Sequence, residues 1–437
     1  MLFERQTSHD NVALVQTHAD GTRQVFFREA NQNKRLSGAE AQAFLDQASS
    51  AGFHLAEFSD DFLIIDRGLD LQAHLRFPGQ AHKETLEGGM LAAFEGGYDS
   101  VVAMPNTSPF LDTAEKLSDC LNGIRELGFK EVKVGQTAAA TVDMKGEETT
   151  DIDSLKQAGA VGITDDGWGV KESSVQVEVF KACARNDLLF MQHAERPGHG
   201  GFASKSRFQT ENNVPEYPRD AESWMVKRDL ELLEQVPEAR YHVLHVTTAL
   251  SVEAIAASKQ KGLRVTAEVS PHHLCFCNED IPDDGQTNST NYKMNPPLFL
   301  KEDQKVLRQA LAEGVIDCVS TDHAPHGAEE KSNPWVQAPF GTRGLATALP
   351  ALCTLSGQGI LDYADLELYF SKRPREVLAL DEFSRAQGFV VVDKTKQWTV
   401  GEDDLPGLSK NSIFLGYPMH GRIVAVLSAQ GYYASGN

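Results

Sequence analysis

Short apolar runs rich in β-branched residues recur along the middle of the chain, and segments with helical spacing separate them. The runs that we predict to be strands are Phe62–Asp66 with an extended continuation towards His74, Ser100–Asn106, Val132–Ala138, Ala160–Asp166, Leu188–His193, Tyr241–Val246, Arg264–Ser270 and Val315–Asp322. Helices are predicted at Thr85–Glu95, Ala114–Leu127, Ser173–Arg185, Ala221–Gln235, Ser251–Gln260 and Asp303–Ala312. Eight strands that alternate with helices predict an α/β fold with a (β/α)8 TIM-type barrel rather than a β sandwich.

Both ends of the chain carry further short β patterns outside this alternation. They lie at Asn11–Thr17, Gln24–Arg28, Phe389–Val392, Trp398–Val400 and Arg422–Leu427. We therefore expect residues 1–61 and 385–437 to form one small β domain beside a barrel of residues 62–384. The segment Leu36–Ala56 has a helical pattern that does not fit a simple sandwich, so the first boundary is the less certain one.

The length and the net charge of the chain exclude some classes of function. The 437 residues, of which 41% are hydrophobic, suffice for a barrel of roughly 250 residues and an accessory domain. A formal net charge of −21 argues against nucleic acid or an anionic membrane as the main partner, because phosphate groups would be repelled. The first residues lack a signal-peptide pattern, no apolar run reaches the length of a membrane span, and the six cysteines are dispersed. We expect a cytoplasmic protein without disulfides.

Polar side chains stand where several of the predicted strands end. They are His74 and Arg76, Asn106, Asp165 and Asp166, His193, His245, and Asp322. In a (β/α)8 barrel these strand ends converge on one mouth. A single histidine at such an end is more often a hydrogen-bonded structural residue, whereas imidazoles and carboxylates together suit Zn²⁺ or another borderline divalent ion. The group as a whole therefore predicts a metal site.

Seven short motifs extend this pattern along the chain. They are Asp70-Leu71-Gln72-Ala73-His74-Leu75-Arg76, Met104-Pro105-Asn106-Thr107, Thr164-Asp165-Asp166-Gly167, His242-Val243-Leu244-His245, Pro271-His272-His273-Leu274, Lys293-Met294-Asn295-Pro296-Pro297 and Thr321-Asp322-His323-Ala324-Pro325-His326. In this order they resemble the class I dihydroorotases of the amidohydrolase superfamily. Each motif alone is weakly specific, but the ordered set covers nearly the whole predicted barrel.

The resemblance implies reversible hydrolysis of dihydroorotate to N-carbamoyl-aspartate, a step of pyrimidine biosynthesis, by water activated at a metal centre. Asp166 would bridge two metal ions, with His193 and His245 on one ion and His74 and Asp322 on the other. Asp166 stands where hydantoinases and dihydropyrimidinases carry a carbamylated lysine, which favours a dihydroorotase over those relatives. The interval to His193 in similar chains favours Asp166 over Asp165 as the ligand.

Asp322 is also the implied catalytic residue, because it would move a proton from the attacking water to the leaving nitrogen. Its alternative role is to cap the following turn. The implied substrate contacts are Arg76, Asn106, Asn295 and His326. Arg76 would hold the substrate carboxylate with its planar fork, helped by a partly cationic His326. The alternatives are a structural ion pair for Arg76 and turn formation for the two asparagines.

Gln72 departs from the family pattern, and Ala346 also replaces an acidic residue that is usual in similar chains. Gln72 replaces the first histidine of a His-x-His motif, and a neutral amide oxygen binds Zn²⁺ more weakly than imidazole. We therefore expect one tight zinc ion, with a second ion weak or absent. Two alternatives stay open: a cyclic amidohydrolase for another ring, such as a hydantoin or dihydropyrimidine, and a catalytically impaired subunit that scaffolds aspartate transcarbamoylase. A homodimer is a further expectation.

Overall fold

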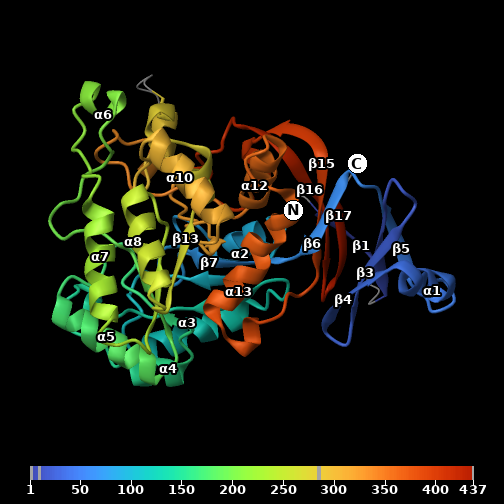
Figure 1. Ribbon diagram of the computed structural model, residues 1–437, viewed down its shortest axis with the longest axis horizontal. Coiled ribbons are helices and arrows are strands. Elements are labelled where there is room, and N and C mark those ends of the chain that lie inside the picture. Colours follow the sequence, from blue (N-terminus) through green and yellow to red (C-terminus); the bar gives the residue numbers. More distant parts are fainter. Residues whose placement is uncertain (1–2, 8–10, 283–286, 436–437) are drawn as a thin grey trace.

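Helices and parallel strands form one part of the molecule, and a smaller β-rich part lies beside it (Figure 1). The computed structural model describes residues 3–7, 11–282 and 287–435. No helix in these ranges combines the length and the apolar character needed to cross a membrane.

The predicted parallel strands are present in the predicted order, but they do not form one closed sheet. The described residues form a three-stranded sheet of β7 (Gly68–Ala73), β8 (Tyr98–Ala103) and β9 (Lys133–Gln136), and a five-stranded sheet of β10 (Gly162–Ile163), β11 (Leu189–Gln192), β12 (Arg240–Val243), β13 (Val265–Val269) and β14 (Cys318–Val319). Single bridges, Ala138↔Ile163 and Ala73↔His323, lie between the sheets. Strands β10 and β14 are each two residues long, so the hydrogen-bonded ladder is interrupted at both seams.

The prediction that Phe62–Asp66 begins the first barrel strand is wrong. This segment is β6 and pairs antiparallel with β15 (Phe389–Thr399) in the smaller part of the molecule. The chain changes sheets at the next two residues, because the N–H of Arg67 donates to Gly388 and the N–H of Gly68 donates to Gly97. The extended pattern continues from Phe62 towards His74 in the sequence. The residues before and after Arg67 nevertheless form hydrogen bonds in two different sheets.

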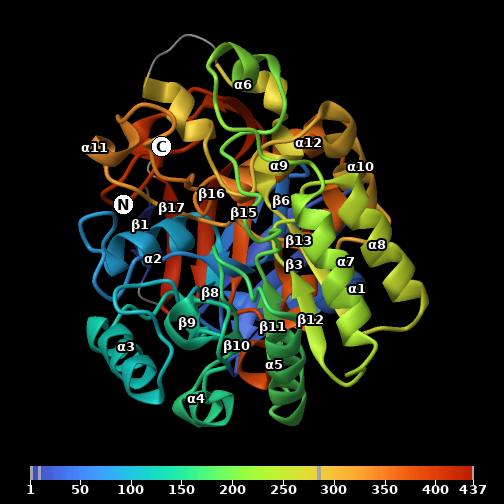
Figure 2. The same cartoon turned by 90° about the vertical axis from the view of Figure 1, so that its left-hand side faces the viewer.

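The six predicted helices are all present and surround the parallel strands (Figure 2). The longer helices are α2 (Leu86–Glu95), α3 (Ala114–Leu127), α4 (Ile152–Ala158), α5 (Ser173–Arg185), α7 (Ala221–Leu233), α8 (Ala249–Gln260), α10 (Lys301–Ala312), α12 (Ala348–Gly357) and α13 (Arg373–Leu378). Shorter ones are α6 (Arg207–Glu211), α9 (Pro271–Cys275) and α11 (Ala328–Lys331). Thr85, Thr113 and Thr248 cap α2, α3 and α8, since each side chain accepts a hydrogen bond from a backbone N–H of the first turn.

Alternate residues of the parallel strands pack into two separate apolar cores. Val101 and Val243 belong to the larger core, which also contains residues of the surrounding helices. Leu71, Met104 and Leu244 belong to a second core that takes residues from both parallel sheets and from α13. Both faces of these strands are buried, so the polar side chains within them, such as Gln72 and His242, are enclosed in the interior.

The two ends of the chain form a pair of small sheets. One has the order β1 (Phe3–Thr7), β17 (Gly431–Ser435), β16 (Pro418–Ser428), β15 and β6; the other has the order β4 (Gln32–Ser37), β3 (Arg23–Glu29), β2 (Val12–Thr17) and β5 (His54–Phe58). Leu14, Phe26 and Val391 are part of an apolar cluster shared by the two sheets.

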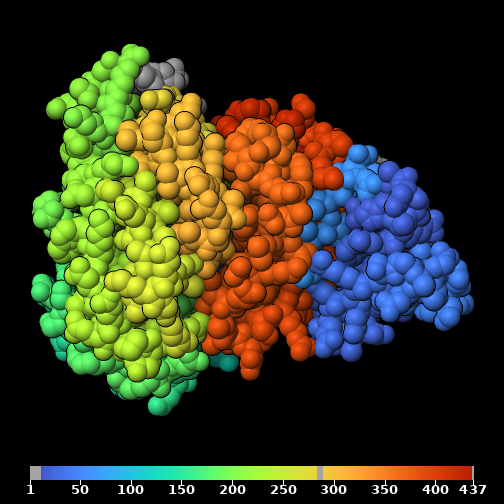
Figure 3. All heavy atoms as spheres, viewed as in Figure 1, coloured from blue at the N-terminus to red at the C-terminus, as the bar shows by residue number. Residues whose placement is uncertain are grey.

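The helical pattern at Leu36–Ala56 is explained by α1 (Gly38–Ala48), which connects β4 to β5. Ala41 and Phe44 of this helix pack against Val25 and Phe27 of the four-stranded sheet. The four-stranded sheet and α1 form the protruding blue end of the space-filling view (Figure 3). The predicted domain boundaries themselves stay a prediction.

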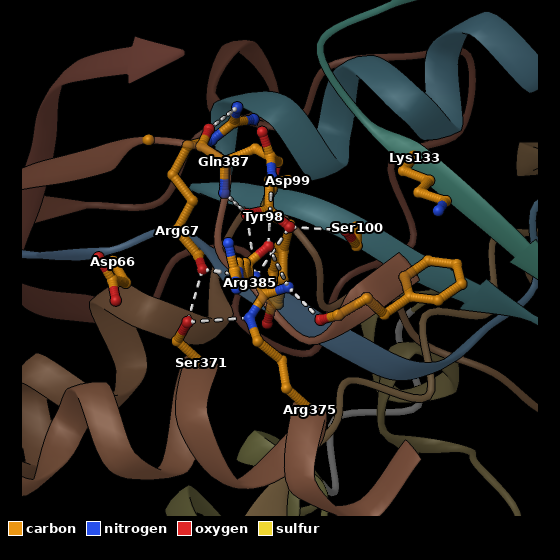
Figure 4. Close-up of polar contacts among 12 residues, drawn as sticks. Asp66, Arg67, Tyr98, Asp99, Ser100, Lys133, Ser371, Arg375, Arg385 and Gln387 are labelled. Atoms are coloured by element: carbon orange, nitrogen blue, oxygen red, sulfur yellow. Dashed lines mark hydrogen bonds and ion pairs between the residues drawn. The ribbon is translucent and has the colours of Figure 1, made fainter. Parts of the chain in front are cut away.

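A buried charged network lies where the small β part meets the parallel strands (Figure 4). Arg375 donates to both carboxylate oxygens of Asp99, over 2.8 and 2.9 Å. Asp99 also accepts a hydrogen bond of 2.5 Å from the backbone N–H of Gln387. Arg67 is 1% exposed and donates to the backbone carbonyl of Tyr98, and burial lowers the pKa of Arg67 to about 10. The network ties α13 and β15 to the amino end of β8.

Candidate active site

A cavity of about 340 Å³ opens at the carboxyl ends of the parallel strands. All nine residues predicted for the site line it, together with Gly167, Trp168, Ala324, Pro339, Phe340 and Gly341. Three of the nine have the left-handed backbone conformation that non-glycine residues rarely adopt: Arg76 (φ 58°), His245 (φ 31°) and Asp322 (φ 47°). Backbone strain of this kind clusters at functional sites, where the surrounding fold holds it.

Asp166, His193 and His245 form a buried group with the composition of a metal site. Their ligand atoms all lie within 4.8 Å of one another. Oδ1 of Asp166 is 3.6 Å from Nδ1 of His193 and 3.9 Å from Nε2 of His245. Burial by itself would raise the pKa of Asp166, but hydrogen bonds from His193 and His245 hold that pKa below its usual value. An ionised carboxylate beside two imidazoles is a donor set that suits Zn²⁺.

Asp165 does not join this group. Its Oδ1 accepts hydrogen bonds from the backbone N–H groups of Ala140, over 2.8 Å, and Thr141, over 3.0 Å. Burial raises the pKa of Asp165 to about 6. The preference for Asp166 as the ligand therefore agrees with the geometry, because the Asp165 carboxylate is used to bind a neighbouring loop.

His74 lies between two carboxylates. Its Nε2 is 3.2 Å from Oδ2 of Asp166 and 3.1 Å from Oδ1 of Asp322, and its Nδ1 is 2.9 Å from Oδ1 of Asn106. When the Nδ1 proton is donated to Asn106, the lone pair of Nε2 faces two acceptor oxygens with no proton between them. A divalent cation would satisfy all three atoms, so these residues fit a metal ion.

Gln72 is fully buried beside the same carboxylate. Its Nε2 donates to Oδ1 of Asp166 over 3.0 Å. Its Oε1 is buried and makes no hydrogen bond within the described part of the chain. An unpaired buried carbonyl oxygen costs free energy, and Gln72 is not among the residues that line the cavity. The amide N–H that faces Asp166 is not a metal ligand.

The side chains of Arg76 and His326 are joined by a hydrogen bond. Nη2 of Arg76 lies 3.1 Å from Nε2 of His326, and Nε of Arg76 donates to the carbonyl of Pro325 over 3.0 Å. Burial lowers the pKa of Arg76 to about 10, so the guanidinium stays charged at neutral pH. Burial and the neighbouring charges of Arg76 and Lys83 hold the pKa of His326 far below its usual value. The expectation of a partly cationic His326 is therefore wrong: it is a neutral acceptor that orients Arg76.

Asn106 and Asn295 differ in whether their side chains keep a hydrogen-bonding group available for a ligand. Both side-chain ends of Asn106 are engaged, because Oδ1 pairs with His74 and Nδ2 donates to the backbone carbonyl of Asp166 over 3.2 Å. Asn295 donates through Nδ2 to Glu195 over 2.8 Å and contacts His193 over 3.2 Å, while its Oδ1 is buried without a partner in the described ranges. Asn106 therefore orients His74, and Asn295 keeps one acceptor for a ligand.

Glu195 was not predicted. Its Oε2 is 3.6 Å from Nε2 of His193, on the far side of that ring from Asp166. A carboxylate there fixes the tautomer that leaves Nδ1 of His193 free to bind a metal. The signal that could have found Glu195 is its place two residues after a predicted ligand, at the end of the same strand.

A second group of metal-ligand types, His242, Glu268 and Cys318, lies buried on β12, β13 and β14. Nε2 of His242 is 3.0 Å from Oε2 of Glu268 and Nδ1 is 2.8 Å from Oγ1 of Thr266. None of the three lines the cavity. A hydrogen-bonded histidine and carboxylate in the interior account for this geometry.

Comparisons with known proteins show which chains this protein is similar to. Residues 62–248 match the family model described as Dihydro-orotase-like. A dihydroorotase of Anoxybacillus flavithermus is 38% identical over 379 residues, covering 84% of this chain and 87% of that protein. A dihydroorotase of Bacillus cereus is 38% identical over 360 residues, covering 81% of this chain and 82% of that protein.

Solved structures with the same fold have lower sequence identity. An L-hydantoinase (dihydropyrimidinase) from Arthrobacter aurescens superimposes with a TM-score of 0.79 at 20% identity, covering 98% of this chain and 97% of that one. A dihydroorotase from Saccharomyces cerevisiae, solved with 5-fluoroorotic acid, gives a TM-score of 0.65 at 16% identity, covering 83% of this chain and 98% of that one. At this identity the structures support the fold alone.

Proposed function

Because the chain belongs to the dihydroorotase family, we propose that it is a metal-dependent cyclic amidohydrolase that reversibly hydrolyses dihydroorotate to N-carbamoyl-aspartate. The observation that carries this proposal is the convergence of Asp166, His193 and His245 with the His74–Asp322 pair on one cavity. Arg76 at the same cavity supports an anionic substrate, since it supplies a local cation in a chain whose net charge is −21.

Each residue has a role that its surroundings support. Asp166, His193 and His245 would hold a tight zinc ion, which would polarise the ring carbonyl and lower the pKa of a water molecule. Asp322 accepts the proton of the attacking water and delivers it to the ring nitrogen when the amide bond breaks. Asp322 is buried, and its Oδ1 lies 3.1 Å from Nε2 of His74.

The substrate end of the cavity is built from Arg76, His326 and Asn295. Arg76 binds the carboxylate of the ring, and neutral His326 keeps the guanidinium pointed at it through the 3.1 Å contact. The unpaired Oδ1 of Asn295 accepts a hydrogen bond from a ring N–H. Asn106 orients His74 through the 2.9 Å contact with Nδ1, and as a residue that lines the cavity it is also proposed to contact the substrate.

The finer fold assignment belongs to the same proposal. We assign the two parallel sheets to one (β/α)8-type barrel, supported by the bridges Ala138↔Ile163 and Ala73↔His323 at its seams. The domain boundaries at 61/62 and 384/385 and the cytoplasmic location are further parts of the proposal. Family membership supports the location, because a step of pyrimidine biosynthesis uses cytoplasmic metabolites.

A second candidate, a catalytically impaired dihydroorotase-like subunit, has one observation in its favour. Gln72 donates an N–H to Asp166 at the place where the family pattern has a histidine. Such a subunit would act by binding aspartate transcarbamoylase. Hydrolysis of hydantoin or dihydropyrimidine rings is less well supported, because neither parent ring carries the carboxylate that Arg76 would bind.

The proposed function is tested by metal analysis of the purified protein together with a hydrolysis assay. Protein purified without chelator is analysed for bound metal and then assayed with dihydroorotate, N-carbamoyl-aspartate, hydantoin and dihydrouracil. We expect about one tight zinc ion per chain and turnover of the first two compounds. Metal-loaded protein that acts on none of the four would contradict the enzyme and leave the scaffold, which a binding assay with aspartate transcarbamoylase then tests.

A further inference from the structure

One wall of the cavity belongs to no helix or strand. Residues 335–341, here called the wall loop, follow α11. Pro339, Phe340 and Gly341 of this loop line the cavity, as does His326. The wall loop therefore contributes to the shape of the end where the substrate carboxylate is proposed to bind.

The ammonium group of Lys293 binds the wall loop through its backbone. Lys293 is 1% exposed, and its Nζ donates to three loop carbonyls: Trp335 over 2.7 Å, Val336 over 3.1 Å and Ala338 over 2.5 Å. Nζ also lies 4.6 Å from the ring centroid of Phe340 and 4.4 Å from that of Phe202. All three donors of this ammonium are thus used on one loop, and Phe340 packs against its charge.

Lys331 binds the other end of the same loop. It is 5% exposed, and its Nζ donates to Pro339 over 3.1 Å, Gly341 over 3.0 Å and Lys293 over 3.4 Å, in each case to the backbone carbonyl. The carbonyl of Lys293 also accepts a 2.9 Å bond from the N–H of Gly341. The segment that carries Asn295 is therefore joined to the wall loop by both lysines.

These two charges are costly for the fold. In the hydrogen bonds that the described residues make, both ammonium groups are bound by carbonyl oxygens alone. Burying a cation without a carboxylate carries a large desolvation cost, which apolar side chains of similar length would avoid. The positive charge of Lys331 also acts on His326, at the substrate end of the cavity. The cost is reflected in the pKa values, because burial lowers the pKa of Lys293 to about 8 and that of Lys331 to about 7.

We propose that Lys293 and Lys331 are positioning residues that clamp the wall loop and thereby determine the affinity of the cavity for an anionic ring substrate. The clamp keeps Phe340 and Gly341 against the cavity beside Arg76 and His326. This inference rests on the proposed function for its substrate, but the hydrogen bonds of the clamp join protein atoms alone.

The experiment replaces each lysine by methionine, which keeps the length and removes the charge. Lys331→Met and Lys293→Met are compared with wild type and with Lys259→Met, a control that removes a lysine bonded to Asp317 over 2.7 Å outside the cavity. Hydrogen exchange of the metal-containing protein is followed by mass spectrometry over residues 334–341. Steady-state kinetics with dihydroorotate give KM and kcat separately.

We expect exchange of the wall loop to rise in both loop variants while exchange in α8 stays as in wild type. KM for dihydroorotate should rise about tenfold, with kcat within about threefold of wild type, because the chemical groups are untouched. Lys331→Arg, which keeps a cation, should recover part of the affinity. Lys259→Met should change neither the loop exchange nor KM.

Unchanged loop exchange in both variants overturns the clamp, whether or not the protein is active. Faster loop exchange with an unchanged KM overturns the role in affinity. Should the single variants fail to fold, Lys331→Arg carries the test through the same exchange and KM measurements. Wild-type protein without any dihydroorotate turnover counts against the proposed function instead, since the exchange result still decides the clamp.

Discussion

The amide nitrogen of Gln72 lies 3.0 Å from Oδ1 of Asp166, and the two side chains come from the ends of β7 and β10. The carboxylate that the family pattern assigns to both metal ions is thus bonded on one side by a neutral donor. Nδ1 of His193 and Nε2 of His245 lie near the same oxygen atom. The two halves of the proposed metal centre are therefore unequal.

This inequality predicts the effect of Gln72→His. Wild type should retain about one metal ion per chain after gel filtration, and the variant should approach two, because an imidazole nitrogen replaces an N–H donor next to Asp166. Dihydroorotate turnover should rise in parallel. Metal analysis and kcat measure both effects, and Gln32→His, at an exposed site, controls for an added imidazole. Two equally tight ions in wild type would contradict the argument.

Asp322→Asn tests the proton transfer. The amide has nearly the same shape but cannot accept a proton from water, so kcat should fall by about 10³-fold or more. The far-ultraviolet circular dichroism spectrum and the melting temperature should stay close to those of wild type. A variant that keeps more than about a tenth of the wild-type kcat would exclude Asp322 as the proton carrier.

Arg76→Lys should affect substrate binding before it affects turnover. Lysine keeps a positive charge but loses the planar fork, including the contacts of Arg76 with Pro325 and His326. We expect KM for dihydroorotate to rise about tenfold or more, with a smaller change in kcat. Steady-state kinetics decide the point. An equal loss in kcat with an unchanged KM would place Arg76 in the transition state rather than in substrate binding.

Buried neutral His326 predicts a pH dependence of stability. Its pKa is held well below the usual value in the folded chain, chiefly by burial, so below about pH 6.5 only the unfolded chain gains this proton. Stability from this group is therefore present above about pH 6.5 and is lost as the pH falls, by up to about 1.4 kcal/mol per pH unit. The melting temperature of metal-free His326→Gln should fall less than that of wild type between about pH 7.5 and about pH 5.5. His82→Gln, an exposed change, is the control.

The bond between Arg375 and Asp99 predicts a large effect on folding. Arg375→Met leaves the buried carboxylate of Asp99 without the Nη2 group that donates to both of its oxygens, which should destabilise the chain by about 3–5 kcal/mol. Urea unfolding followed by tryptophan fluorescence measures the loss. Arg373→Met removes an exposed arginine 3.3 Å from Glu376 and should cost under about 1 kcal/mol. Similar losses in both variants would argue against a structural role for the buried network.

Local pattern was enough to predict the order of elements and the convergence of the site. The strand ends that carry His74, Asp166 and His193 follow from β-branched runs of the right length, and parallel topology brings such ends together. The same pattern failed at Phe62–Asp66, because the choice between two sheets depends on a hydrogen-bonding partner far along the chain. The segments predicted at Phe389–Val392 and Trp398–Val400 likewise belong to one strand, β15, which ends at Thr399 and whose register shifts between Asp393 and Gln397.

The chemistry of single residues was harder to predict than their location. The charge of His326 depends on its burial and on nearby cations, neither of which the sequence displays. The role of Glu195 beside a proposed metal ligand follows from its 3.6 Å distance to Nε2 of His193 in the structure. Lys293 lies in a predicted motif, but its three bonds to the wall loop depend on a segment with no regular pattern of its own.

The pairing of β6 with β15 has a consequence for the growing chain on the ribosome. Ile65 is made early but meets its partner Val390 only after every parallel strand has been synthesised. Until then β6 exposes an unpaired apolar edge, the kind of surface that associates with other nascent chains. Slow or interrupted translation ahead of residue 389 should therefore favour aggregation and chaperone capture, while the parallel strands can already fold.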